Sequence, residues 1–101
     1  MSCKIIQWDT EKPIIHVKPD MGGLNYIMDN NILWLKIQGT DTEYDNITMI
    51  GEVQKSNRKG IYIIYLKENV KGEGINHNGR IVFLNDLNPK EQNDLDVIKL
   101  I

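Results

Sequence analysis

Three absences narrow what this chain of 101 residues can be. It has no alanine, the strongest helix former, so its helical signal is weak throughout. Its single cysteine, Cys3, excludes an internal disulfide and gives no reason to expect an oxidising compartment. It has no apolar run long enough to span a bilayer and no signal-peptide pattern after Met1. We therefore expect a cytoplasmic protein, in the host cytoplasm if the gene is viral.

The composition is that of one globular domain, which we place at residues 1–101. The chain is 41% apolar and 26% charged, and a chain of this length buries enough surface to fold without metal or disulfides. It contains 16 Ile and 11 Asn but only 2 Arg, which indicates an AT-rich gene. Charge is unevenly spread, because residues 1–50 hold 4 basic and 7 acidic side chains and residues 51–101 hold 8 and 7. The local extremes are the acidic run 41–45 and the basic run 55–59.

The fold class follows from short apolar runs separated by Asn, Gly, Asp and Pro. This pattern predicts an all-β fold, with α+β as the alternative. We expect one small antiparallel β-sandwich or partly open barrel of seven or eight strands. A helix start at Asn88, Pro89 and Glu91 allows at most one short helix, near residues 88–94. Residues 95–101 suit either a strand or a continuation of that helix. The candidate strands are 3–8, 14–18, 24–29, 32–38, 47–54, 61–67, 70–76 and 80–85.

Three hairpins follow from the alternation of apolar side chains and from the turn residues between them. The turns are Asn30-Asn31, residues 55–60 and Asn78-Gly79, and each suits a tight reversal. Strand 61–66 has apolar residues on both faces, which predicts a central strand. The predicted cross-strand pairs are Met28–Leu33, Tyr26–Leu35 and Leu24–Ile37, then Val53–Tyr62, Gly51–Ile64 and Met49–Leu66, and lastly Ile75–Val82 and Gly74–Phe83.

The glycine-rich stretch KGEGINHNGR, residues 71–80, has a second interpretation as a phosphate-binding loop. Such a loop needs its glycines to open a helix, so that backbone N–H groups and the helix dipole meet the anion. The glycines here match neither common phosphate-loop spacing, and the following RIVFL is typical of a strand. The sequence therefore favours a hairpin over a phosphate site.

Residues capable of catalysis are sparse, and we expect a protein that is not an enzyme. The possible soft metal ligands are Cys3, His16 and His77, and no pair has ligand spacing, so we expect no metal and no cofactor. The alternative is a small enzyme that uses Glu52 or Cys3 in a barrel mouth. Glu52 lies in mid-strand on a partly apolar face, where burial would raise its pKa and suit it to acid–base chemistry.

A protein-binding or inhibitory module is the leading functional hypothesis, such as an accessory protein of a virus or mobile element. Trp34 lies on the more polar face of its strand, where it is either covered by a second layer or exposed as an anchor for a partner. Open strand edges also suggest a homodimer. The candidate interaction residues are Ile27, Ile32, Trp34 and Lys36.

The second hypothesis is a small β-barrel that binds single-stranded nucleic acid. Basic side chains at one hairpin tip would contact phosphates, and two tyrosines on the adjoining strand would stack on bases. The negative net charge and the isoelectric point of about 5.6 count against it. The residues of this site are Lys55, Arg58, Lys59, Tyr62 and Tyr65.

Overall fold

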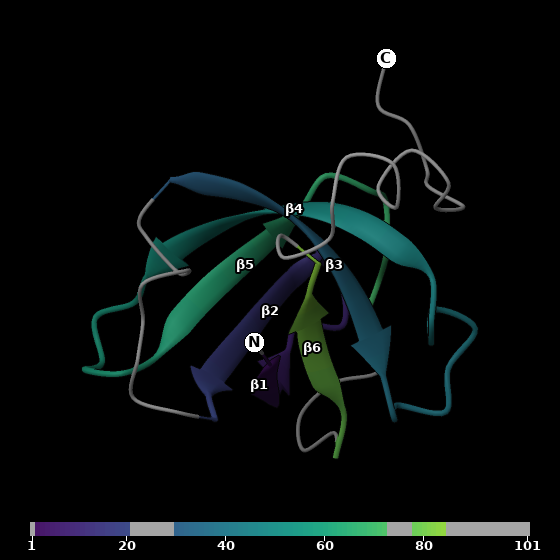
Figure 1. Cartoon of the computed structure of the whole chain (residues 1–101), viewed down its shortest axis with the longest axis horizontal. Coiled ribbons are helices and arrows are strands. Elements are labelled where there is room, and N and C mark those ends of the chain that lie inside the picture. The colour runs from purple at the N-terminus through teal and green to yellow at the C-terminus, as the bar shows by residue number, and fades with distance from the viewer. Residues whose placement is uncertain (1, 21–29, 73–77, 85–101) are drawn as a thin grey trace.

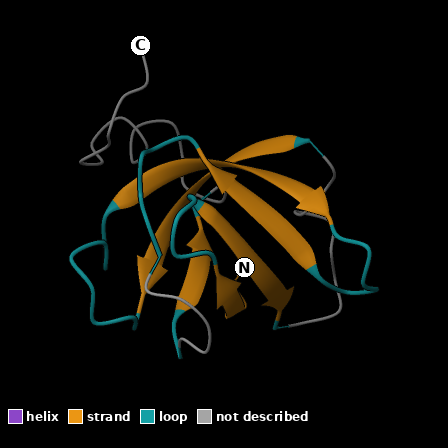
Figure 2. Ribbon diagram, turned by 180° about the vertical axis from the view of Figure 1, so that it is seen from behind, coloured by secondary structure: helices purple, strands orange, loops and turns teal. Residues whose placement is uncertain are grey.

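The computed structural model describes residues 2–20, 30–72 and 78–84. The strands of these residues close into a small β-barrel. The strands are antiparallel and close in the order β1-β2-β5-β4-β3-β6 (Figures 1 and 2). They are β1 (Ser2–Trp8), β2 (Ile14–Pro19), β3 (Asn31–Gln38), β4 (Thr48–Lys55), β5 (Tyr62–Leu66) and β6 (Arg80–Phe83). The all-β prediction is confirmed, with six strands over these residues where seven or eight were expected.

Side-chain alternation along each strand fills the barrel interior. Successive residues of a strand point to opposite faces, so every second residue enters the core. In β1 an irregularity between Ile5 and Gln7 shifts this alternation, so that Ile5 and Trp8 are both buried. On β5, Tyr62, Ile64 and Leu66 are buried, whereas Ile63 and Tyr65 face outward and are partly exposed. Each fully buried aliphatic side chain contributes roughly 1.5–3 kcal/mol of transfer free energy. The core comprises Cys3, Ile5, Trp8, Ile15, Val17, Leu33, Leu35, Ile37, Met49, Val53, Tyr62, Ile64, Leu66, Val70, Ile81 and Phe83.

The hairpin of β4 and β5 is present, but its register differs from the predicted one. Val53 pairs with Ile64 and Gly51 with Leu66, which is a shift of two residues from the expected partners. The sheet ladder reaches closer to the turn than expected, and Ser56 N–H donates to the Ile61 carbonyl at 3.0 Å to close it. A slip of two residues keeps every side chain on its predicted face, because the side-chain period of a strand is two.

Two of the three pairs predicted for the first hairpin, Tyr26–Leu35 and Leu24–Ile37, are wrong, because at those positions both edges of β3 are taken by other segments. Leu35 lies between Met49 of β4 and Phe83 of β6, so it has no edge left for Tyr26. Ile37 pairs with Ile81 and forms a bridge with Asp45, so it has none for Leu24. Residues 24–29, including Met28, lie outside the described residues.

In the third predicted hairpin, the pair Ile75–Val82 is wrong for the same reason. Val82 of β6 lies between Ser2 of β1 and Lys36 of β3, so its predicted partner Ile75 has no free edge to join. Barrel closure pairs the first and last described strands, so that each described strand has a neighbour on both sides, which a local turn signal cannot reveal. Residues 73–77 and 85–101 lie outside the described residues. Three predictions therefore concern residues that the structure does not describe: the centre of the glycine-rich stretch, the short helix near 88–94 and the segment 95–101.

The central position of the strand predicted at 61–66 is confirmed, since β5 lies between β2 and β4. Within the three described ranges, no helix has the length and apolar character required to cross a membrane.

Candidate functional site

The outward side chains of four adjacent strands form the first candidate site, which we call the outer sheet face. One row of it crosses β2, β5, β4 and β3 through Ile14, Tyr65, Glu52 and Ile32. The remaining members lie beside this row: His16 on β2, Ile63 on β5, Ile50 and Gln54 on β4, and Trp34 and Lys36 on β3. The face is therefore mainly apolar, although it lies outside a barrel whose interior is already filled.

Exposure within the outer sheet face is greatest at β3. Ile32 is 62% exposed, the largest value for any large hydrophobic side chain in the described part of the chain. Trp34 lies directly opposite Ile50 of β4 and is partly exposed. The structure therefore matches neither extreme that the sequence allowed for Trp34, full cover or full exposure. Ile27, the fourth candidate interaction residue, lies outside the described residues.

The negative charge of Glu52 in the outer sheet face is neutralised by Lys67, the residue that follows β5. The Lys67 ammonium lies 3.3 Å from the Glu52 carboxylate, and the Gln54 amide donates to the same carboxylate at 3.0 Å. The hydrogen bond from Gln54, followed by that from Lys67, lowers the pKa of Glu52. The raised pKa expected for Glu52 is therefore wrong, because hydrogen bonds from Gln54 on the same strand and from Lys67, 15 residues away in sequence, stabilise the carboxylate. An ionised, paired carboxylate is poorly suited to act as a general acid.

Cys3, the other residue of the enzyme alternative, points into the core. Its side chain is fully buried, and this burial, reinforced by the charge of Asp20, raises the pKa of the thiol to about 12. A thiol with such a pKa stays protonated at neutral pH, and the thiolate is the nucleophilic form. His16 lies on β2 between Gln7 and Ile63, on the outward side of the sheet, and His77 lies outside the described residues. The described residues thus contain no Cys–His nucleophile pair built on Cys3 and His16.

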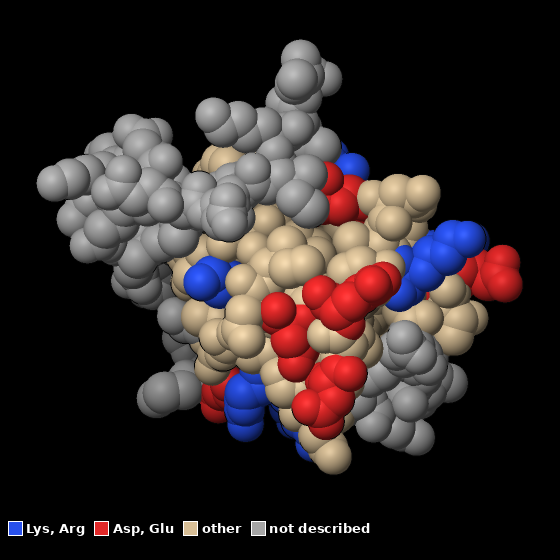
Figure 3. All heavy atoms as spheres, turned by 90° about the vertical axis from the view of Figure 1, so that its right-hand side faces the viewer, with Lys and Arg blue, Asp and Glu red and all other residues tan. Residues whose placement is uncertain are grey.

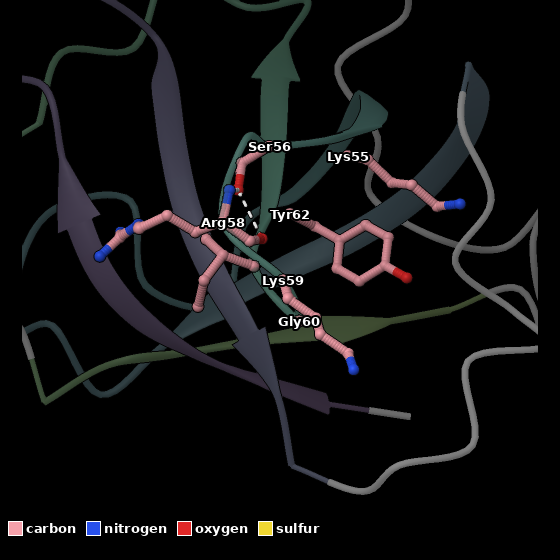
Figure 4. Close-up of a pocket in the computed structure, with 7 residues that line it drawn as sticks. Lys55, Ser56, Arg58, Lys59, Gly60 and Tyr62 are labelled. Carbon is pink, nitrogen blue, oxygen red and sulfur yellow. Dashed lines mark hydrogen bonds between the residues drawn. The ribbon is translucent and has the colours of Figure 1, made fainter.

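The second candidate site is a pocket of about 340 Å³ at the loop between β4 and β5, which we call the loop pocket (Figure 4). It brings together four residues of the predicted nucleic-acid site but not the fifth. Tyr65 lies on the outer sheet face, whereas Tyr62 points inward, because the two are an odd number of residues apart on one strand. The pocket is lined by Lys55, Ser56, Arg58, Lys59, Gly60, Ile61 and Tyr62.

The backbone of the loop is held by local hydrogen bonds. Ser56 Oγ accepts from the Arg58 N–H and donates to the Arg58 carbonyl, both at 3.1 Å. Ile61 N–H donates to that same carbonyl at 3.1 Å, and Gly60 takes a left-handed conformation with φ of 79°. Lys55 and Lys59 extend on either side of the Tyr62 ring, while Arg58 extends in the opposite direction (Figure 4).

Acidic groups gather at the other end of the molecule. The loop between β3 and β4 and the loop between β4 and β5 lie at opposite ends in Figure 1. Figure 3, viewed from the side of the β3–β4 loop, shows Asp and Glu side chains clustered on that face. Asp45 accepts hydrogen bonds from the Thr40 hydroxyl and from the N–H groups of Thr40 and Asp41, and the Thr40 hydroxyl is the main cause of its lowered pKa. The acidic run 41–45 and the basic run 55–59 of the sequence therefore lie at opposite ends of the molecule (Figure 1).

Sequence reasoning missed Ile14, Ile50 and Ile63 as members of the outer sheet face. Alternation shows that each points outward on its own strand, but only the strand order shows that they adjoin Trp34 and Ile32. Among the described residues, no group of three or more His, Cys, Asp or Glu side chains could hold a metal ion.

No family model, no curated protein and no solved structure matches this chain. The function is therefore argued from the geometry of the two candidate sites.

Proposed function

We propose that this protein is a binding module, and not an enzyme, that docks on a partner protein through the outer sheet face. The observation that supports this proposal is the run of outward apolar side chains over four adjacent strands, with Ile32 at 62% exposure. The barrel interior has its own complete set of buried residues, so these outward side chains are not needed to build the core. An apolar centre with a polar rim is the usual anatomy of a protein–protein interface.

Trp34 is the anchor in this proposal. Trp34 lies opposite Ile50 on the neighbouring strand and is partly exposed, so a partner would bury apolar area without first reorganising the sheet. Tryptophan is enriched among the residues that dominate binding energy, and its truncation there often costs ~2 kcal/mol or more.

The partner's chemistry follows from the charges of the face. Glu52 is compensated by Lys67, whereas Lys36 forms no ion pair with any described residue. The uncompensated charge is therefore positive, and a partner with an apolar patch and an acidic side chain opposite Lys36 fits it. A symmetric second copy fits less well, because it would bring two like-charged faces together. Every described strand of the closed barrel also has a neighbour on both sides, which disfavours the expected homodimer through open strand edges and leaves a sheet face as the route to a dimer.

The test compares three variants with the wild-type protein. Trp34→Ala and Ile32→Lys alter the outer sheet face, and Lys4→Glu alters an exposed position on β1. A partner is first identified by capture with wild-type bait, then purified, and its affinity for each variant is measured by calorimetry. We expect Trp34→Ala to weaken binding by about 30-fold or more, since ~2 kcal/mol corresponds to that factor. Lys4→Glu should bind as the wild type does.

Equal affinity of all variants for the purified partner would refute the proposal. Light scattering over a concentration series tests the alternative, a homodimer. A dimer that Ile32→Lys abolishes would show that a second copy of the chain binds the outer sheet face. Circular dichroism must show an unchanged fold for every variant.

A further inference from the structure

The loop pocket has the size and charge of a site for an anion. Its volume of about 340 Å³ lies at the lower end of the range for small-molecule sites. Three of its lining residues are cationic and none is acidic. Arg58 and Lys59 are exposed and form no ion pair with any described residue. Among the described acidic residues, Glu52 is nearest in sequence to the pocket. It lies on the outer sheet face and forms an ion pair with Lys67.

The geometry favours an extended anion over a compact one. The two lysines extend beside the Tyr62 ring and Arg58 extends the other way, so one small anion cannot contact all three cations in this arrangement (Figure 4). A chain of linked phosphates can reach both sides of the loop. The acidic loop lies at the far end of the molecule, which reduces repulsion of a polyanion at this end.

The exposure of Tyr62 and Tyr65 indicates whether this site could stack on bases as well as contact phosphates. Tyr62 is only 4% exposed, so it offers little ring surface on which a base could stack. Tyr65 faces the outer side of β5 and is absent from the pocket lining. The stacking platform that the sequence suggested is therefore missing, and the loop offers cations for phosphates but no surface for bases.

We propose that the loop pocket binds a chain of linked phosphates through Arg58 and Lys59, without reading bases. The shared chemistry is the repeating phosphate, whether it belongs to a single-stranded nucleic acid or to inorganic polyphosphate. This site is separate from the outer sheet face, so the two proposals stand or fall independently.

The test is fluorescence anisotropy with a labelled 12-nucleotide single strand, chosen at about the site size of small nucleic-acid-binding barrels. We expect a micromolar dissociation constant in dilute salt, and at physiological salt about 10⁻⁴–10⁻⁶ M, the usual range of non-specific binding. Each phosphate contact adds about −0.7 to the slope of log affinity against log salt, so the contacts of Arg58 and Lys59 predict a slope of about −1.4. Homopolymers of different bases should bind within about twofold of each other, because no stacking platform is present.

The decisive comparison is between two double variants that remove the same charge. Arg58→Gln/Lys59→Gln should weaken binding by at least about tenfold and reduce the salt slope by about 1.4, since two contacts are lost. Lys4→Gln/Lys18→Gln removes two exposed lysines that pair across β1 and β2, and it should change affinity by no more than about twofold. Equal loss in both double variants would overturn the proposal, and so would no detectable binding in dilute salt.

Competition distinguishes the two sources of phosphate. Inorganic polyphosphate of 12 units should displace the oligonucleotide completely, because both present the same repeating group. Tighter binding of the oligonucleotide would assign the site to nucleic acid, and tighter binding of polyphosphate would assign it to that polymer. Failure of polyphosphate to compete at any concentration would refute recognition through phosphates alone.

Discussion

Adding one methyl group inside the barrel, in Gly51→Ala, tests whether the core is packed as the structure shows. A Cβ at Gly51 would lie 2.8 Å from Cγ2 of Ile64 and 3.0 Å from Cδ2 of Leu35. Both neighbours are fully buried on the strands that flank β4, so neither can move into solvent. The substitution must therefore shift packed side chains or the strands that carry them.

The expected cost combines two opposing effects. Overpacking a filled core costs about 1–3 kcal/mol, and the loss of glycine's backbone freedom in the unfolded chain returns roughly 0.5–1 kcal/mol. We expect a net destabilisation of about 1–2 kcal/mol, which lowers the melting temperature by roughly 5–15 °C in a domain of this size.

Thermal denaturation followed by circular dichroism measures the cost of Gly51→Ala, and a double-mutant cycle assigns it. Ile64→Ala alone should cost about 2–5 kcal/mol, because it leaves a cavity. In that background Gly51→Ala should cost little or should stabilise, which gives a coupling energy of about 1 kcal/mol or more. A Gly51→Ala protein that melts at or above the wild-type temperature, or a cost unchanged by Ile64→Ala, would show that this packing is wrong.

Two further predictions concern buried titratable groups. Glu68 is 8% exposed, its Oε1 has no hydrogen-bond partner among the described residues, and desolvation raises its pKa above the usual 4.5. The folded state therefore keeps the proton where the unfolded state loses it, so this residue's contribution to stability falls as pH rises from 4.5 through the raised value. Glu68→Gln should remove that fall and raise the melting temperature at pH 7, and identical pH profiles for the two proteins would contradict the assignment. Cys3 should react with a thiol reagent at pH 8 about a thousandfold more slowly than an ordinary thiol, because its pKa of about 12 is three units above 9.0; labelling at the rate of a free peptide thiol would show that it is not buried.

The sequence by itself determined which side of each strand faces the core. Alternation of apolar residues has a period of two, and the turn at 55–60 connects strands that are adjacent in sequence. Val53 and Ile64 therefore point inward as predicted, even though each has a partner two residues from the expected one. The same alternation placed Trp34 and Lys36 outward on β3.

Only the tertiary structure decided the neighbours of β3 and β6. The turn residues predicted two further hairpins, but β3 pairs with β4 across the loop at 39–47, and β6 pairs with β1 and β3 across long stretches of chain, because closing the barrel gives every described strand a neighbour on both sides. The candidate sites depend on those partners. The outer sheet face exists because β3, β4, β5 and β2 adjoin. The pKa of Glu52 is lowered first by the hydrogen bond from Gln54 on the same strand, and then by Lys67, which the pairing of β4 with β5 brings beside it. Strand alternation predicts that Tyr62 and Tyr65 lie on opposite faces of β5. The pocket that Lys55, Arg58 and Lys59 line forms only when the loop between β4 and β5 is folded.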